Sequence, residues 1–383
     1  MISPLALLGV NLARLACGIP PWIVLPATIG SVASLNFFTL LYGPSGTGKS
    51  GAVGVSRERF YVSDPSTTFA EQPAQLNLGS GEGIVAAFAH WDSKAKTTVQ
   101  HCSAVEFEVD EIETLTKIAQ RQGGTILAVV RSVYFGGRLG FQNRNTERAV
   151  QIPAHSYRVG LIVIGQPSKC EQLLNEEDAG TPQRFLWVPT VDPTIDRPTG
   201  EAPEVMSYHC GLQRSGDKLI LGLPDVAVTQ IQDAYLEAQR GQRDGLDSHA
   251  LLLRAKVAAL LALHEHRVIV SEEDWRLAGI ITDVSARGQR EVAETIAAEA
   301  AKRGEAKAKR EGTLNAIRID QQDVGIRNRA KGRILERLGK GPANVRELTL
   351  PLSKPQREHL DDILAELIDS GRVKLRGSRY VLV

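Results

Sequence analysis

Short apolar runs alternate with helical segments over the N-terminal half of the chain. Helices are predicted at residues 5–16, 83–90 and 112–120. The apolar runs predict buried strands at residues 22–25, 36–42, 60–62, 105–109, 125–129, 159–164 and 185–188. Strands this apolar are typical of a parallel sheet covered on both faces, so the pattern predicts an α/β domain.

From residue 225 onwards the pattern is helical. Residues 250–263 are apolar on nearly all sides, which predicts a buried helix. Ser271 and Asp274 form a capping-box-like start to the next helix. Residues 289–310 are rich in Ala, Glu, Lys and Arg, with few large apolar side chains, and predict an exposed connecting helix.

The end of the chain predicts a small separate domain. A basic helix is expected at residues 326–338 and a short helix near residues 345–348. Ser353 caps a longer helix that Gly371 ends, and a hairpin of residues 373–375 and 380–383 follows. One face of that longer helix is apolar and consists of Leu360, Ile363, Leu364, Leu367 and Ile368. Three helices and a terminal hairpin predict a winged-helix domain.

Composition narrows the class of protein. Of 383 residues, 43% are hydrophobic and 23% charged, which excludes disordered, fibrous and collagen-like chains. The four cysteines include no C-x-x-C pair, which excludes a zinc ribbon and a disulfide scaffold and predicts a reducing, cytoplasmic compartment. Residues 15–47 carry no charge, but prolines interrupt any helix there, so no membrane span is expected. Residues 324–383 carry 13 Lys or Arg against 7 Asp or Glu, which favours a polyanionic partner.

The strongest candidate chemistry is a phosphate-binding loop that follows the strand at residues 36–42. The loop fits the pattern G-x-x-x-x-G-K-[ST] and consists of Gly43, Pro44, Ser45, Gly46, Thr47, Gly48, Lys49 and Ser50. Its glycines let backbone N–H groups turn towards phosphates. Lys49 is expected to bridge the β- and γ-phosphates and Ser50 to ligate Mg²⁺, so the predicted cofactors are ATP and Mg²⁺.

An acidic pair ends the strand at residues 105–109. Asp110 is expected to hold Mg²⁺ through water, and Glu111 to orient and deprotonate the attacking water. A solvated acidic strand end is the alternative. Glu106 and Glu108 alternate with the apolar residues, so one face of this strand must be polar.

Two further polar residues stand at strand ends. Gln166 follows the strand at residues 159–164, where P-loop motors place a sensor of the γ-phosphate; a plain strand cap is the alternative. Arg184 precedes the strand at residues 185–188 and is expected to act as an arginine finger on a neighbour's nucleotide or as a sensor in cis. A structural ion pair is its alternative.

A basic, amide-rich loop lies between the acidic pair and Gln166. Loops of this kind line the central channel of ring motors and follow a nucleic-acid backbone, whereas a solvated hairpin is the other interpretation. The residues predicted to contact nucleic acid here are Arg138, Asn143, Arg144 and Arg148.

Residues 3–285 resemble the primase–helicase-type P-loop ATPases of phages, plasmids and integrated elements, which are relatives of RecA/DnaB-like ring helicases. The resemblance rests on the order of the P-loop, the Ser80–Glu82 turn, the acidic pair, Gln166 and Arg184. It implies a RecA-like P-loop ATPase core, which we place at residues 1–224. The sequence patterns described above predict that a helical extension (225–288), a charged helical linker (289–325) and the winged-helix domain (326–383) follow. It also makes Glu82 a rival catalytic base, although Glu111 is favoured because it adjoins the Mg²⁺ residue.

The resemblance implies ATP hydrolysis and a DNA-associated role. We expect an ATP-driven DNA motor, a ring-forming replicative helicase of a mobile element, that assembles as a hexameric homo-oligomer on single-stranded DNA. The alternative is an ATP-dependent replication initiator or helicase loader that acts as a switch and recruits a host or element replication protein. Family members often carry a primase-polymerase domain upstream, and without one this chain is not expected to prime by itself.

The charges of the winged helix do not fit ordinary groove insertion. Its third helix, residues 354–370, carries two basic and five acidic residues, which phosphates would repel. We therefore expect DNA contact through the first helix and the hairpin, or protein docking through the acidic helix. The hairpin residues predicted to contact DNA are Lys374, Arg376 and Arg379.

Overall fold

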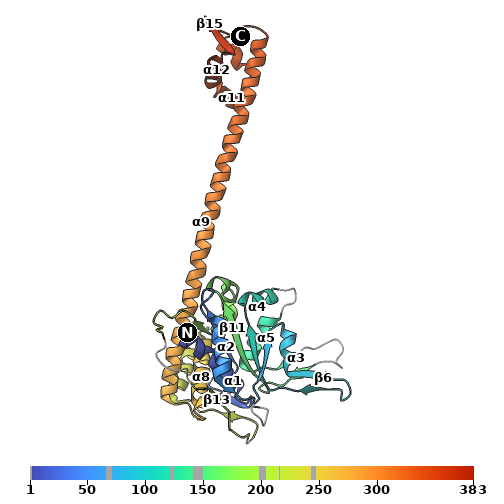
Figure 1. Cartoon of the computed structure of the whole chain (residues 1–383), viewed down its shortest axis with the longest axis vertical. Coiled ribbons are helices and arrows are strands. Elements are labelled where there is room, and N and C mark those ends of the chain that lie inside the picture. Colours follow the sequence, from blue (N-terminus) through green and yellow to red (C-terminus); the bar gives the residue numbers. More distant parts are fainter. Residues whose placement is uncertain are drawn as a thin grey trace. The chain divides into compact units, whose positions relative to one another are not determined.

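The chain divides into two compact units, Met1–Ala298 and Glu299–Val383. The computed structural model describes residues 2–65, 71–120, 125–140, 150–197, 204–214, 216–242 and 247–383 (Figure 1). The longest helix, α9 (Glu272–Gly339), contributes its first part to one unit and its last part to the other. The division falls inside the segment predicted as a charged linker, while the four predicted domain boundaries stay predictions.

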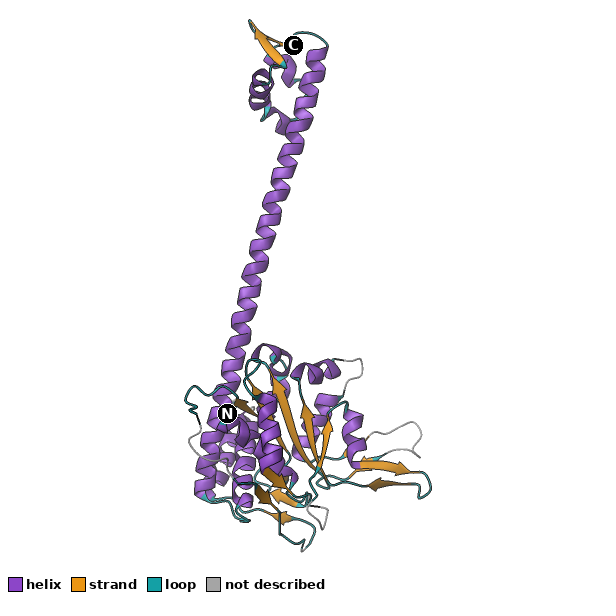
Figure 2. Cartoon of the chain, viewed as in Figure 1, coloured by secondary structure: helices purple, strands orange, loops and turns teal. Residues whose placement is uncertain are grey.

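A five-stranded, all-parallel sheet forms the centre of the first unit (Figure 2). Its order is β12 (Phe185–Pro189), β3 (Phe37–Tyr42), β11 (Arg158–Gly165), β8 (Ala104–Val109) and β5 (Ala74–Asn77). The predicted α/β class with a parallel sheet is therefore confirmed. A sheet of this kind, followed by a long helical region, is compatible with a Rossmann-like or RecA-like core.

Helices cover both faces of this sheet, as the apolar strands predict. In β3, Phe37 and Leu41 point into one buried cluster, whereas Phe38 and Leu40 point into the other. The first face packs on α1 (Pro4–Cys17), α2 (Lys49–Arg59) and α8 (Asp247–His264). The second packs on α3 (Gly81–Phe88), α4 (Ile112–Ala119) and α5 (Ile126–Phe135), as Figure 1 shows.

The predicted strand at residues 125–129 is wrong, because this segment lies in α5. Ile126, Val130 and Val133 are buried at helical spacing, and the helix ends at Gly136, whose φ of 75° is left-handed. A five-residue apolar window does not reveal that period. Conversely, β5 was not predicted, because all four of its side chains are exposed and only Leu76 is large and apolar.

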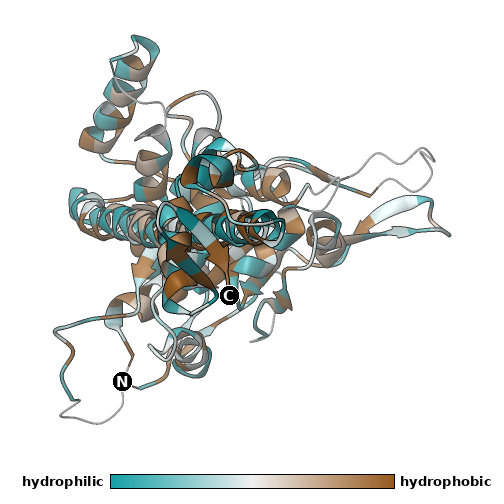
Figure 3. Ribbon diagram, turned by 90° about the horizontal axis from the view of Figure 1, so that it is seen from above, coloured by the Kyte–Doolittle hydropathy of each residue, from teal (hydrophilic) through white to brown (hydrophobic). Residues whose placement is uncertain are grey.

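Small sheets of short strands surround the central sheet. Figure 3, coloured by hydropathy, shows the projecting β6–β7 ribbon largely in pale and hydrophilic colours. The predicted helix at residues 83–90 extends too far, because α3 ends at Phe88 and residues 89 and 90 belong to β6. Three of these small sheets are pairs: β4 (Phe60–Val62) with β13 (Met206–Tyr208), β6 (Ala89–Asp92) with β7 (Thr97–Gln100), and β9 (Leu139–Gly140) with β10 (Gln151–Ile152). A fourth has three strands, in the order β14 (Leu219–Ile220), β1 (Ile23–Leu25) and β2 (Ala33–Ser34).

The predicted helical region is present. The apolar segment of α8 is buried. Lys256 within it is fully buried, with Nζ donating to Asn36 O at 2.7 Å and to Tyr134 O at 2.6 Å. The predicted cap of α9 is confirmed, since Ser271 N donates to Asp274 Oδ2 at 2.8 Å and Asp274 N to Ser271 Oγ at 3.1 Å. The remaining helices of this unit are η2 (Pro167–Lys169), α6 (Glu171–Leu174), η3 (Glu177–Ala179), η4 (Pro182–Arg184) and α7 (Asp225–Gln239).

The second unit has its own apolar core beneath the end of α9. The predicted helix after Ser353 is divided at Glu358 and His359, because Ser353 and Gln356 cap a separate short helix. The predicted basic helix at residues 326–338 has no start of its own and is the end of α9. The other elements here are α10 (Val345–Thr349), α11 (Lys354–Arg357), α12 (Leu360–Asp369), β15 (Val373–Arg376) and β16 (Arg379–Leu382). Of the predicted apolar face, only Ile368 is exposed.

Across the described ranges, we find no helix with the length and apolar character that crossing a membrane requires.

Candidate active site

The predicted phosphate-binding loop joins β3 to α2 at the carboxyl edge of the sheet. Gly46 and Gly48 have φ angles of 81° and 79°, in the left-handed region that favours glycine. Gly43 is constrained by space, because a Cβ there would overlap Thr190 Oγ1. Gly48 is the N-cap of α2, so the N-terminal end of this helix faces the loop. Helix ends of this kind offer free N–H groups to phosphate.

Lys49 lies across its own loop. Its Nζ donates to Gly43 O at 2.8 Å and also to Pro44 O. Burial lowers the pKa of this lysine, which shows that the ammonium is partly removed from water. Thr47 Oγ1 donates to Pro44 O at 2.9 Å and lies 2.7 Å from Thr190 Oγ1, which ties the loop to the end of β12. The loop is therefore held in shape by its own side chains.

A cavity of about 470 Å³ opens beside the loop. Because β3, β8 and β11 are parallel neighbours, their carboxyl ends meet at one edge, where open α/β sheets bind ligands. The structure thus brings Asp110, Glu111 and Gln166 to the P-loop, as the sequence predicts. The lining residues are Ser45, Gly46, Gly48, Lys49, Ser50, Gly51, Asp110, Glu111, Ile112, Glu113, Ile164, Gly165, Gln166 and Lys169.

These residues fit a magnesium-bound nucleoside triphosphate. Lys49 and the N–H groups at the start of α2 supply donors for phosphate oxygens. The Ser50 hydroxyl and the Asp110 carboxylate are oxygen ligands of the kind that Mg²⁺ binds together with substrate phosphates. Glu111 and Gln166 are on the same cavity wall, where a water molecule could be oriented.

The polar face of β8 is neutralised by two arginines from the covering helices. Glu106 and Glu108 point towards α1 and α2, opposite to the apolar face formed by Val105, Phe107 and Val109. Arg57 Nη2 lies 2.7 Å from Glu106 Oε1 and 2.7 Å from Glu108 Oε2.

Arg14 completes this arrangement. Its Nη1 lies 3.6 Å from Glu106 Oε2, and both side chains are buried. Burial raises the pKa of Glu108, and the Asp110 carboxylate two residues further on adds to this rise. The glutamates of β8 therefore place negative charge next to the site, and Arg14 of α1 and Arg57 of α2 balance this charge. The sequence predicts only that one face of this strand is polar, and it contains no signal that identifies Arg14 and Arg57.

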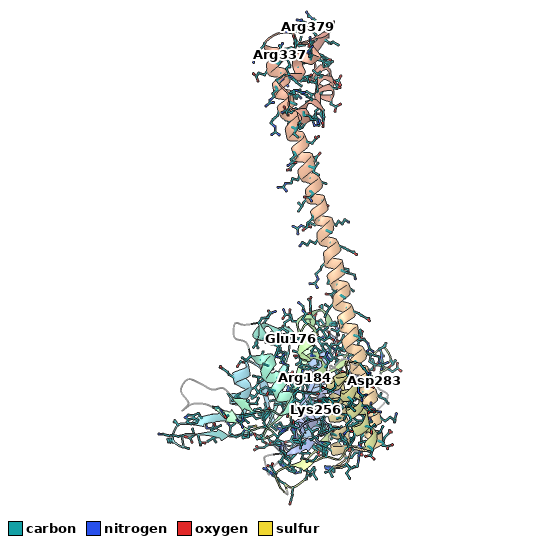
Figure 4. The ribbon with its side chains drawn as sticks, turned by 180° about the vertical axis from the view of Figure 1, so that it is seen from behind. Glu176, Arg184, Lys256, Asp283, Arg337 and Arg379 are labelled. Atoms are coloured by element: carbon teal, nitrogen blue, oxygen red, sulfur yellow. The ribbon has the colours of Figure 1, made fainter. Side chains whose placement is uncertain are left out.

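Arg184 is not brought to the cavity wall. Its side chain is buried, with Nη1 donating to Ala179 O at 2.9 Å and the guanidinium 5.3 Å from the centre of the Phe135 ring. Nη2 lies 3.4 Å from His249 Nε2. Figure 4 shows Arg184 and Lys256 within the body of the first unit. The predicted finger stays a prediction, and it requires Arg184 to leave these contacts.

Glu82 also lies apart from the cavity lining. It is exposed in the first turn of α3, where Ser80 Oγ accepts from Gly83 N at 2.9 Å and caps the helix. Of the two rival bases, Glu111 alone is among the residues that line the cavity. This placement favours Glu111, although the assignment of the base stays a prediction.

The structure describes only some of the residues that are predicted to contact nucleic acid. Arg138 is exposed just before β9, whereas Asn143, Arg144 and Arg148 lie outside the described residues. Lys374, Arg376 and Arg379 are exposed on the β15–β16 hairpin, and Arg379 is labelled in Figure 4.

Lys169 and Glu113 line the cavity although the sequence analysis did not select them. Lys169 stands one turn after Gln166, and Glu113 stands two residues after Glu111, so their closeness to predicted site residues was the available signal. The chain matches no family model and no curated protein sequence with which it was compared.

Proposed function

We propose that the chain is an ATPase whose site is the cavity beside the P-loop. The observation that carries this proposal is the convergence of Lys49, Ser50, Asp110, Glu111 and Gln166 on one cavity at the carboxyl edge of a parallel sheet. Lys49 would hold the β- and γ-phosphates, and Ser50 and Asp110 would hold Mg²⁺. When bound, Mg²⁺ would neutralise charge on the phosphate oxygens.

The proposed hydrolysis uses the chain's own acid and amide. Glu111 accepts a proton from the attacking water, and Gln166 donates from its amide to the γ-phosphate or that water. Glu111 follows β8, and Gln166 follows β11. The register of these strands is fixed, because β11 pairs with β3 over six positions and with β8 over six positions. A rigid sheet edge of this kind supports the alignment that phosphoryl transfer requires.

We further propose that the core is RecA-like and that ATP hydrolysis drives movement along single-stranded DNA, as in a hexameric ring helicase of a mobile element. The resemblance of residues 3–285 to primase–helicase-type P-loop ATPases supports this proposal, and Arg138 is the described part of the proposed channel loop. Arg184 is proposed to complete a neighbour's site after release from Phe135 and His249.

The second unit is proposed to be a winged-helix domain. Three of its features support this proposal: helices α10 and α12, the end of α9, and the terminal β15–β16 hairpin, all around one apolar core. The basic residues at the end of α9 are partly engaged, since Glu366 Oε1 pairs with Lys331 at 2.5 Å and Glu366 Oε2 pairs with Arg327 at 2.9 Å. The exposed hairpin is therefore the better candidate for contact with DNA.

The alternative function is an ATP-dependent initiator or helicase loader. The acidic face of α12 supports this alternative, since Asp361, Asp362 and Asp369 are exposed there and would suit a basic protein partner. In this case ATP would switch the chain between states without translocation.

Unwinding of a forked DNA substrate distinguishes the two functions. With ATP and Mg²⁺, a motor displaces the labelled strand, and Glu111→Gln protein bound to ATP does not. A loader leaves the fork intact but increases the amount of a replicative helicase bound to single-stranded DNA when ATP is present. ATP-dependent strand displacement supports the motor, and helicase recruitment without displacement supports the alternative.

A further inference from the structure

A second lysine lies on the wall of the P-loop cavity. Lys169 ends the short helix η2, which begins directly after Gln166 at the end of β11. Lys49 enters the same cavity from the P-loop. Two cations from different strand ends therefore face one space, where the γ-phosphate of a bound nucleotide would carry the most exposed charge.

Lys169 is held by a carboxylate of the same cavity. Its Nζ lies 3.0 Å from Glu113 Oε1, and Glu113 stands in the first turn of α4, just after Asp110 and Glu111. The hydrogen bond from Lys169 lowers the pKa of Glu113, which favours the carboxylate form of Glu113. The bond joins the end of β11 to the start of α4.

This ion pair is weak enough to be exchanged. The Lys169 side chain is 47% exposed and that of Glu113 is 36% exposed. Ion pairs this exposed contribute little to stability, because water screens both charges. A terminal phosphate carries more charge than one carboxylate and offers three oxygens, so its hydrogen bonds to an ammonium are stronger. The balance favours transfer of the lysine to phosphate.

We propose that Lys169 senses the γ-phosphate. When a nucleoside triphosphate enters the cavity, the Lys169 ammonium leaves the Glu113 carboxylate and binds the γ-phosphate. This inference rests on the proposed function of the site. Glu113 is then free at the start of α4, and a diphosphate, which lacks the terminal group, leaves the Lys169–Glu113 pair intact. The pair thus distinguishes ATP from ADP within a single subunit.

The consequence extends to the elements that α4 contacts. This helix packs on β8, β11 and α5, and Thr116 Oγ1 donates to Glu113 O at 3.0 Å within its first turns. Release of the Glu113 side chain removes the tie between α4 and η2. The nucleotide state is therefore transmitted to the face of the sheet that carries α5.

Equilibrium binding of fluorescent nucleotides tests this assignment. The full chain is titrated with Mg²⁺ and either ADP or a non-hydrolysable ATP analogue. We expect Lys169→Ala to weaken binding of the analogue about tenfold or more while changing ADP affinity less than about twofold. Lys169→Arg should retain the preference for the analogue, and Glu113→Gln should strengthen binding of the analogue about two- to fivefold, because the competing partner is lost.

Lys94→Ala is the control, since Lys94 is exposed in the turn between β6 and β7 and does not line the cavity. It should leave both affinities unchanged, and thermal unfolding shows whether each variant is folded. Equal weakening of both nucleotides by Lys169→Ala, or no weakening of either, overturns the inference while the wild-type chain still binds ATP. If the wild-type chain binds neither nucleotide, the proposed function is overturned, and the inference with it.

Discussion

Arg57 Nη2 lies 2.7 Å from Glu106 Oε1, although the two residues stand 49 positions apart in the sequence. Arg57 is in the last turn of α2, the helix that begins at Lys49, and Glu106 is in β8, the strand that precedes Asp110. The ion pair therefore connects the helix that presents Lys49 and Ser50 to the strand that presents Asp110 and Glu111. This partly buried contact joins the two halves of the proposed site.

Removal of this contact should cost stability. Arg57→Ala leaves Glu106 buried with only Arg14 at 3.6 Å, so we expect the free energy of unfolding to fall by about 1–3 kcal/mol. Urea denaturation measures this loss. In a double-mutant cycle with Glu106→Gln, the effects should be non-additive by about 1 kcal/mol. Strict additivity would show that the pair contributes nothing.

The choice between two catalytic bases can be tested by kinetics. Glu111→Gln should keep ATP binding and lower the rate of hydrolysis about 10²–10⁴-fold, because general-base catalysis is lost while the side chain keeps its shape. Glu82→Gln is the matched comparison and should have a much smaller effect, since Glu82 lies apart from the cavity lining. An inactive Glu82→Gln protein beside an active Glu111→Gln protein would reverse the assignment.

His249 should make stability depend on pH. Burial, and then the charge of Arg184, lower the pKa of His249 from 6.5 to about 4. Between these values the unfolded chain binds a proton that the folded chain does not. This part of the stability is complete above about pH 6.5 and is lost as the pH falls to about 4.

The size of this effect is limited by the partial exposure of the ring. We expect a loss of about 1–2 kcal/mol from pH 7 to pH 4. Urea denaturation at several pH values measures it, and His249→Gln should show a correspondingly smaller loss over the same range. An identical pH dependence in the variant would contradict the prediction.

The β15–β16 hairpin should contribute to DNA binding. Replacement of Lys374, Arg376 and Arg379 by Glu should weaken binding to single-stranded DNA and lower the slope of affinity against salt concentration by about 2. The matched control reverses charges on α12 instead: Asp361→Lys with Asp362→Lys should not weaken binding. Unchanged affinity and salt slope in the hairpin variant would leave protein docking as the role of this unit.

Much of the fold and of the site could be predicted because both follow local patterns. The P-loop has a fixed spacing, and polar residues directly follow the predicted strands that became β8 and β11. The positions of Asp110, Glu111 and Gln166 beside the P-loop were therefore predictable, because parallel strands end at one edge of the sheet. Strand β5 could not be found, because its exposed side chains carry no apolar signal. The burial of Arg184 depends on Phe135 and His249, which are far from it in sequence.

Two other features of the structure were not predicted. The Lys169–Glu113 pair joins residues 56 positions apart, and neither residue belongs to a spaced motif. The continuity of α9 through residue 326 was missed because a change in charge and apolar content was interpreted as the start of a new helix. Helices continue through such changes when no residue caps or breaks them.

The release of phosphate from Mg²⁺·ATP by the full chain, with and without single-stranded DNA, tests the central claim most directly. The wild-type chain should hydrolyse ATP. Lys49→Ala should lower turnover at least about a hundredfold, because the transferring phosphoryl group loses its main fixed cation. Lys94→Ala, in the exposed turn between β6 and β7, should hydrolyse ATP at the wild-type rate. Turnover by folded Lys49→Ala protein at the wild-type rate would contradict the account.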